Sequence, residues 1–307
     1  MNLQRSPWIA SELMQRPEHR MGFVDGIGDE INDWIQRCPE VVEDDVSMDD
    51  VAGMKCLTEL ASRVRVELTS GSGVARVSPP TVAEYDDQFL RRYYLAFGVL
   101  LGDPLGNYGR LYEVKDRGGD YTKTAIPVSQ TRAATGLHTD SSAIDVLPDM
   151  VGLICIRAAS EGGSSRIACA IRAYLRLQET DHHSLSILEN SHLRDIVTPG
   201  ADQSQRLRNQ FPVFRSDPDQ GLICRYMRFW IEKGYEKAEV AFPEGLENAL
   251  DSLDHCLEEE ESVADFRLQR GEMLWVDNCT TLHDRTEYVD DPEAPRLLLR
   301  QWVKHTK

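Results

Sequence analysis

The sequence has few basic residues and no long run of apolar ones. Lys and Arg total 34 against 51 Asp and Glu, so the formal net charge is −17. A surface this acidic repels phosphate backbones, and we expect no nucleic-acid partner. No segment approaches 18 consecutive apolar residues, so we expect no membrane span. The first ten residues lack the apolar core of a signal peptide, which predicts a cytoplasmic protein.

Cysteine is present without any of the spacings that give it a structural role. The seven cysteines are scattered, the count is odd, and no pair is spaced Cys-x-x-Cys. This argues against a disulfide framework and against a structural zinc site, and predicts small buried side chains or free thiols. Internal repeats and low-complexity linkers are also lacking. Because barrels and sandwiches of 307 residues often form one domain, we expect a single domain over residues 1–307.

The first third of the chain has helical periodicity. Apolar residues recur at helical spacing over residues 48–68, after the capping residue Ser47. Residues 85–101 predict a second amphipathic helix that ends near Gly102. We therefore expect residues 1–70 to be a helical N-terminal extension.

From about residue 110, short apolar runs alternate with Gly, Pro and Asp. The runs at 151–156, 221–226, 273–276 and 297–303 predict buried strands. Helical stretches at 170–177 and 231–260 interrupt them. The pattern predicts a mainly β fold with helical decoration. Its core over residues 71–307 would be a β-sandwich or barrel with helices outside and inserted.

One pair of residues, His138 and Asp140, has metal-ligand spacing. On an extended segment, residues i and i+2 point to the same face, so both side chains can reach one ion. With 8 histidines and 51 acidic residues in 307, about 1.3 His-x-Asp/Glu matches are expected by chance. The motif alone equally fits a loop histidine followed by a capping aspartate.

A second histidine, His283, follows the apolar strand at 273–276. It can complete a metal site from the opposite sheet, or it can be a loop histidine that bonds to Asp284. Two histidines and one carboxylate on one face of a metal leave three positions open, which suits non-haem Fe(II) oxygenases.

Two arginines lie in the last apolar run. If residues 296–303 form a strand, Arg296, Leu298, Arg300 and Trp302 share one face. An arginine facing the core requires an anionic partner, and a guanidinium binds a carboxylate in bidentate fashion. The alternative is an edge strand with solvated arginines.

Together these residues resemble the taurine dioxygenase/γ-butyrobetaine hydroxylase-like (clavaminate synthase-like) superfamily of Fe(II)/2-oxoglutarate oxygenases. The resemblance runs from about residue 70 to 303. It includes the segments 111–118, 224–231 and 283–286, and the order His-x-Asp, distant His, then Arg a dozen residues later.

The resemblance implies a double-stranded β-helix (jelly-roll) core. It implies Fe(II) held by His138, Asp140 and His283, with 2-oxoglutarate and O2 as co-substrates. Arg296 would pair with the distal carboxylate of 2-oxoglutarate, assisted by Ser165 in place of the family's threonine. Arg300 matches a position that faces the co-substrate or an anionic substrate. Because Asp140 is present, the resemblance also argues against halogenation.

The implied reaction is hydroxylation or desaturation of a small amino-acid-like or natural-product-pathway substrate, with release of succinate and CO2. Two other interpretations remain: a zinc-type metallohydrolase using the same triad, and a non-catalytic small-molecule-binding jelly roll. Association of identical subunits stays open. The candidate pocket residues are Asn107, Tyr108, Gln130, Arg225 and Arg228.

Overall fold

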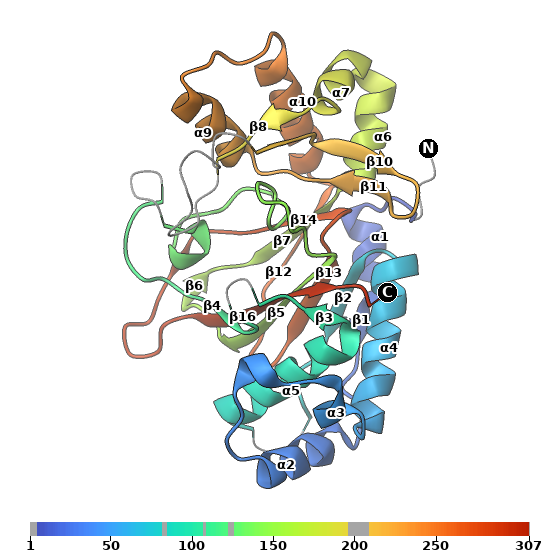
Figure 1. Cartoon of the computed structure of the whole chain (residues 1–307), viewed down its shortest axis with the longest axis vertical. Coiled ribbons are helices and arrows are strands. Elements are labelled where there is room, and N and C mark those ends of the chain that lie inside the picture. Colours follow the sequence, from blue (N-terminus) through green and yellow to red (C-terminus); the bar gives the residue numbers. More distant parts are fainter. Residues whose placement is uncertain (1–4, 82–84, 107–108, 122–125, 196–208, 307) are drawn as a thin grey trace.

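The fold is built around a large mixed sheet (Figure 1). The computed structural model describes residues 5–81, 85–106, 109–121, 126–195 and 209–306. Within these ranges, seven strands form this sheet, in the order β1-β2-β13-β5-β16-β3 with β4 paired to β16. Their bounds are β1 Arg20–Met21, β2 Val74–Val77, β3 Asp103–Pro104, β4 Tyr112–Val114, β5 Met150–Arg157, β13 Met273–Asp277 and β16 Leu297–Lys304. The predicted strands at 151–156, 273–276 and 297–303 are thus its centre.

A second, three-stranded antiparallel sheet packs against one face of the large sheet. It has the order β12-β7-β14, with bounds Val263–Phe266, Ser165–Cys169 and Thr281–Arg285. Alternation along the strands explains the packing, because successive side chains point to opposite faces. On β13, Leu274 and Val276 join the apolar cluster shared with β7 and β12, while Met273 and Trp275 join the cluster on the other side.

Helices cover the outer faces of both sheets. The first group is α1 Ala10–Gln15, α2 Ile27–Arg37, α3 Met48–Val51, α4 Lys55–Ser70 and α5 Asp87–Leu101. Helices α2 to α5 share an apolar cluster with the large sheet in the lower half of Figure 1, whereas α1 lies beside β12. The remaining helices lie at the top. The second group is α6 Ala170–Thr180, α7 His182–Leu188, α9 Arg228–Ala238 and α10 Leu246–Glu258. Strands form the core, but among the described residues the helices contain more residues than the strands do.

Short two-stranded pairings complete the described part of the chain. They are β10–β11, β15–β6 and β8–β9. The predicted strand at 221–226 is β11. The bounds are β6 Glu161–Gly162, β8 His192–Leu193, β9 Gln210–Phe211, β10 Phe214–Asp217, β11 Gly221–Cys224 and β15 Tyr288–Val289.

Two of the predicted helices are each divided in the structure. The stretch 231–260 is α9 and α10, because Glu239 and Gly245 both adopt left-handed backbone conformations between them. The stretch 48–68 is α3 and α4, which a turn at 52–54 separates. Helical periodicity continued through both breaks, so the apolar pattern alone did not reveal them.

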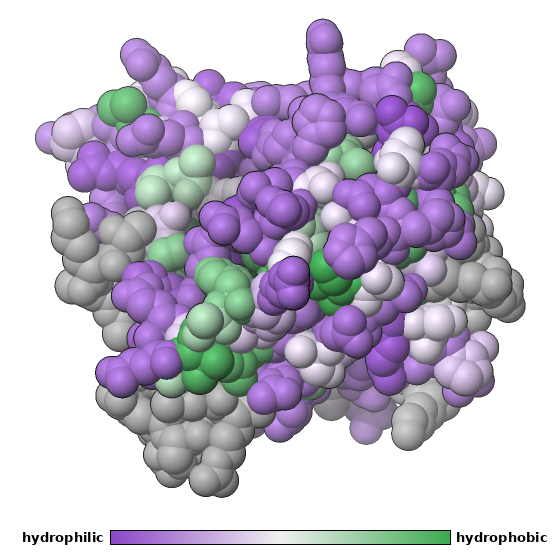
Figure 2. Space-filling model, turned by 90° about the horizontal axis from the view of Figure 1, so that it is seen from above, coloured by the Kyte–Doolittle hydropathy of each residue, from purple (hydrophilic) through white to green (hydrophobic). Residues whose placement is uncertain are grey.

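The surface seen from above in Figure 2 is mostly polar, with hydrophobic side chains in several small areas, the largest of them at the lower left. In the described ranges, no helix combines the length and apolar character that crossing a bilayer requires. The seven cysteines are unpaired, and five of them are buried.

Candidate metal centre

Two distant segments meet at a single pair of backbone hydrogen bonds. The amide of His138 donates to the carbonyl of His283 at 3.0 Å, and the amide of His283 donates back at 2.9 Å. His283 lies in the middle of β14, whose pairing with β7 fixes it in the smaller sheet. This bridge therefore places both imidazoles on the same side of the backbone contact, with ring centroids 4.6 Å apart.

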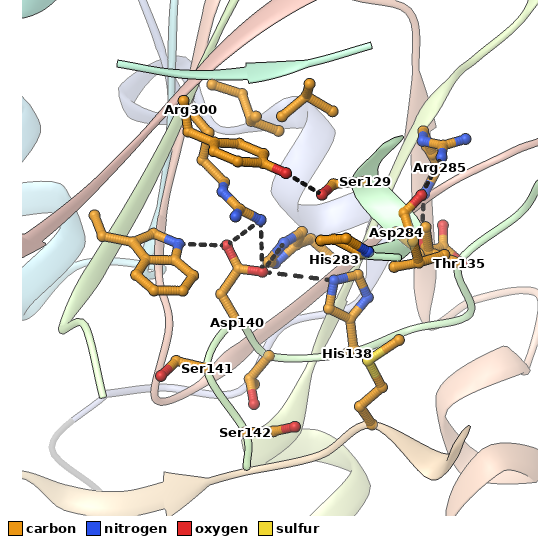
Figure 3. Close-up of a pocket in the computed structure, with 18 of the residues that line it drawn as sticks. Ser129, Thr135, His138, Asp140, Ser141, Ser142, His283, Asp284, Arg285 and Arg300 are labelled. Carbon is orange, nitrogen blue, oxygen red and sulfur yellow. Dashed lines mark hydrogen bonds and ion pairs between the residues drawn. The ribbon is translucent and has the colours of Figure 1, made fainter. Parts of the chain in front are cut away.

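Asp140 completes a triad of ligand atoms that all lie within 4.8 Å of one another. The Nε2 atoms of His138 and His283 are 3.7 Å and 3.8 Å from Oδ1 of Asp140. All three residues are buried (Figure 3). The structure thus brings together the three residues that the sequence singled out.

The Asp140 carboxylate is held by two residues of β16. The indole Nε1 of Trp302 donates to Oδ2 at 2.7 Å. Nη1 of Arg300 is 3.1 Å from each oxygen. Burial alone would raise the pKa of the Asp140 carboxyl, but the Arg300 guanidinium holds that pKa well below its usual range. The carboxylate is therefore anionic at neutral pH.

The imidazole of His138 has the outer hydrogen bond that metal-bound histidines usually have. Its Nδ1 lies 2.8 Å from the carbonyl oxygen of Gly136, so Nδ1 carries a proton and Nε2 is the nitrogen that faces Asp140. Burial, and then the nearby His138, lower the pKa of His283 to about 3. His283 is therefore neutral at pH 7, and its Nδ1 has no hydrogen-bond partner in the described structure.

Asn278 supports the site from behind, and nothing in the sequence pattern indicated it. Its side-chain oxygen accepts from the amide of Asp140 at 2.8 Å. Its Nδ2 donates to the carbonyls of Asp140 and Pro148, at 3.0 Å and 3.1 Å. The residue is fully buried at the end of β13. One amide side chain thus fixes the backbone at both ends of the loop 140–148.

Arg296 is a buried cation in the same cavity. It is 3% exposed, and its guanidinium lies 4.9 Å from the centroid of the Tyr288 ring. Burial lowers its pKa, and Nη1 has no hydrogen-bond partner among the residues described. Its closest described partner is the Tyr288 side chain, and the carboxylate of Asp140 in the same cavity is paired with Arg300 instead. A buried guanidinium with an unused N–H donor can bind an anion that enters the cavity.

The cavity that contains these groups has a volume of about 160 Å³. Its wall includes the triad, and Ser165 lies in it as the first residue of β7. Leu298, Arg300 and Trp302 line it together with Arg296, so the predicted shared face of β16 faces the cavity. The remaining polar or charged residues in the wall include Tyr112, Ser129, Thr135, Ser141, Ser142, Asp195, Asp284 and Arg285.

Asp195 is a second carboxylate in the wall, and no pattern in the sequence indicated it. It follows β8 and is 1% exposed. Oδ2 pairs with Lys237, while Oδ1 has no hydrogen-bond partner in the described ranges. Trp230, whose carbonyl accepts from the Asp195 amide at 2.8 Å, lines the same part of the wall. Asp195 is therefore an acceptor available to a bound molecule.

The other predicted pocket residues lie outside the cavity lining. Gln130 reaches it only through the Tyr112 hydroxyl, to which its Nε2 donates at 2.9 Å. Arg225 stacks on Phe211 at 3.6 Å and donates to backbone carbonyls of the 141–144 loop. Arg228 forms ion pairs with acidic residues of α9 and α10 instead. Asn107 and Tyr108 lie outside the described residues.

Comparison with known proteins agrees with this geometry. The model of the taurine catabolism dioxygenase TauD, TfdA family matches residues 49–302. The chain therefore belongs to this family, and the predicted resemblance is confirmed.

Individual relatives share about a quarter to a third of their residues with the chain over the matched regions. FR-33289 synthase of Streptomyces rubellomurinus (strain ATCC 31215) is 28% identical over 67% of this chain and 61% of its own length. A uridine-5'-phosphate dioxygenase of Amycolatopsis sp is 30% identical, over 67% of this chain and 76% of that protein. For a second such dioxygenase, from Streptomyces sp, the match covers 63% of its length. The chain thus spans less than two thirds of two of these proteins.

Solved structures show the same fold at lower sequence identity. An asparagine oxygenase in complex with Fe(II), 2S,3S-3-hydroxyasparagine and succinate aligns with a TM-score of 0.64 and 18% identity, covering 93% of each chain. The non-heme iron oxygenase OrfP in complex with Fe and alpha-ketoglutaric acid aligns with a TM-score of 0.61 and 12% identity, covering 93% of this chain and 94% of that one.

Asn278→Ala should lower the free energy of unfolding by about 3 kcal/mol, because it leaves buried backbone groups of Asp140 and Pro148 without partners. Urea denaturation measures this change. Asn190→Ala is the matched control, since Asn190 is exposed and its Nδ2 donates to the carbonyl of Ser186 at the surface. We expect the control to change stability by less than about 0.5 kcal/mol. Equal effects of the two substitutions would contradict the role given to Asn278.

Proposed function

We propose that this protein is an Fe(II)- and 2-oxoglutarate-dependent dioxygenase that hydroxylates or desaturates a small amino-acid-like or natural-product-pathway substrate. One observation carries the proposal: two imidazoles and a carboxylate converge in a buried cavity that also contains the unpaired cation Arg296. Membership in a dioxygenase family supports it.

The donor set fits a divalent iron ion. Two imidazole nitrogens and one carboxylate oxygen on one face of a metal are typical of non-haem Fe(II) oxygenases. His138 Nε2, Asp140 Oδ1 and His283 Nε2 would be the ligands. The ion, with 2-oxoglutarate and O2, would supply the oxidising chemistry and release succinate and CO2. The protein's own part is to hold these groups and to keep bulk water away from a mostly buried site.

Arg296 would bind the distal carboxylate of 2-oxoglutarate. Its fork of N–H donors matches a carboxylate, and a charge-assisted bond in a buried site is strong. Ser165 lies in the same wall and can add a hydroxyl donor. The crystal structure of OrfP with alpha-ketoglutaric acid supports the choice of co-substrate. A zinc-type hydrolase would give Arg296 no such role.

The charges in the wall favour an amino-acid-like substrate. Arg300 lies between the rings of Tyr112 and Trp302, at 4.8 Å and 4.9 Å from their centroids. It can bind a carboxylate, and Asp195 Oδ1 can accept from an ammonium group. Two structural neighbours are named for complexes with amino acids, hydroxyasparagine and (3S)-hydroxy-L-Arg. We infer that this chain's substrate is of the same size and charge pattern.

We further propose that the two facing sheets form the jelly-roll core of a single catalytic domain over residues 1–307. The support is the fold that the chain shares with the iron oxygenases. Residues 1–70 would form the helical extension. In the described structure, helices α2 and α4 of this region pack in one apolar cluster with strands β5, β13 and β16. A separately folded segment would not share a core in this way.

Wild-type protein given Fe(II) and 2-oxoglutarate without oxygen should develop the visible charge-transfer band of chelated 2-oxoglutarate. His283→Ala should abolish the band because one ligand is lost. His255→Ala, on the exposed side of α10, is the control and should retain it. Absence of the band in wild-type protein would reject the dioxygenase assignment.

Arg296→Ala should raise the Kd for 2-oxoglutarate at least about tenfold, since a buried charge-assisted bond is worth roughly 1.5–3 kcal/mol. Iron binding should be largely unchanged. Titration of the charge-transfer band measures the first quantity, and a metal-binding assay the second. Arg157→Ala, which removes a half-exposed surface cation paired with Asp87, is the control. Unchanged co-substrate affinity in Arg296→Ala would show that another residue binds the distal carboxylate.

Succinate formation should rise when the correct substrate is added to the loaded enzyme. A panel of L-amino acids, including asparagine and arginine, should stimulate it more than a panel of nucleoside 5'-monophosphates. Stimulation by nucleotides alone would overturn the amino-acid assignment and leave the dioxygenase class intact.

A further inference from the structure

The two oxygens of the Asp140 carboxylate have different surroundings. Oδ1 faces Nε2 of His138 and Nε2 of His283, at 3.7 Å and 3.8 Å. Oδ2 accepts the indole N–H of Trp302 at 2.7 Å. Arg300 does not distinguish them, because its Nη1 is 3.1 Å from both. The asymmetry of the carboxylate therefore comes from Trp302.

Trp302 is well suited to fix one oxygen. It lies on β16 opposite Val151 of β5, so its backbone is held in the centre of the large sheet. The side chain is 8% exposed, and its ring packs on the Arg300 guanidinium. An indole N–H is a donor only and does not titrate near neutral pH. The indole N–H of Trp302 therefore remains a donor to the Asp140 carboxylate across the neutral pH range.

We propose that Trp302 is a positioning residue for the metal. By holding Oδ2, it presents Oδ1 alone to the ion, so that Asp140 binds through one oxygen. The proposal rests on the proposed function, since it requires a metal at the triad. Without the N–H, Oδ2 retains only the shared contact with Arg300, and the carboxylate can turn so that both oxygens reach the ion. Such chelation would occupy a coordination position that 2-oxoglutarate or O2 requires.

Anaerobic titration with Co(II), which reports its ligands in visible absorption, tests this idea. Trp302→Phe keeps an aromatic ring beside Arg300 but removes the donor. Loss of a hydrogen bond to a metal ligand typically weakens metal binding 10- to 100-fold, roughly the range we expect for the Kd of Co(II). The Co(II) absorption spectrum should also change. In the Co(II)-loaded variant, the Kd for 2-oxoglutarate should rise, because the second carboxylate oxygen competes for its position.

Trp275→Phe is the matched control. Trp275 is also fully buried in the large sheet, on β13, but its Nε1 has no hydrogen-bond partner within the described ranges. It belongs to the apolar cluster on the side away from the cavity. The control should lose stability through the smaller ring, while the Kd and the spectrum of bound Co(II) stay as in wild-type protein.

A second variant keeps the test decisive if Trp302→Phe does not fold. Incorporation of β-(3-benzothienyl)alanine at position 302 replaces the N–H by sulfur and retains the shape of the ring. It should weaken Co(II) binding in the same way. Wild-type Co(II) affinity and spectrum in a folded variant without the N–H would overturn the inference. Failure of wild-type protein to bind Co(II), or to bind 2-oxoglutarate beside it, would instead reject the proposed function.

Discussion

The buried charge of Asp140 is the constraint around which the rest of the site is arranged. A carboxylate taken out of water is costly unless it is paired and hydrogen-bonded. Here Arg300 supplies the opposite charge, Trp302 supplies a neutral donor, and Asn278 holds the backbone. These partners come from β16 and from the end of β13, so the large sheet supports the anion. The histidines that face it are tied together by the bridge between β14 and residue 138.

The local charge of the cavity differs from that of the whole protein. The chain carries a formal net charge of −17, yet Arg285, Arg296 and Arg300 all line this one cavity. Each is largely removed from water. Arg285 is held by backbone carbonyls of the 128–133 segment, and burial lowers its pKa to about 10. The same wall also contains Asp140, Asp195 and Asp284, and Arg300 is paired with Asp140. An anion in the cavity would therefore be held by short-range contacts with single cations such as Arg296, since the net charge of the chain does not attract it.

Sequence spacing predicted the features that depend on neighbouring residues, such as the face of a strand to which a side chain points. It failed for contacts between segments that are distant in the sequence. The alternation over 296–302 was sufficient to place Arg296, Arg300 and Trp302 on one face, because side chains alternate along any strand. The family resemblance connected His283 with His138.

Asn278 and Asp195 were missed, since their contacts depend on loops that meet only after folding. The breaks at 52–54 and 239–245 were missed because apolar periodicity continues across them. Arg225 and Arg228 were candidate pocket residues, but their side chains contact Phe211, backbone carbonyls and acidic residues outside the cavity lining.

Arg296, immediately before strand β16, and Arg300 and Trp302 within it line a single wall, and this has a consequence for which changes the pocket can accept. The residues that would hold the co-substrate, face the substrate and position the metal ligand all lie within residues 296–302. A change at Arg300 or Trp302 is transmitted to the other through their ring contact and through Asp140. New substrate preferences are therefore more readily acquired in the segments 128–135 and 141–144, which line the same space without contacting the carboxylate through their side chains. A substitution in these loops should therefore reshape the pocket with less disturbance of Asp140 than a substitution on the strand.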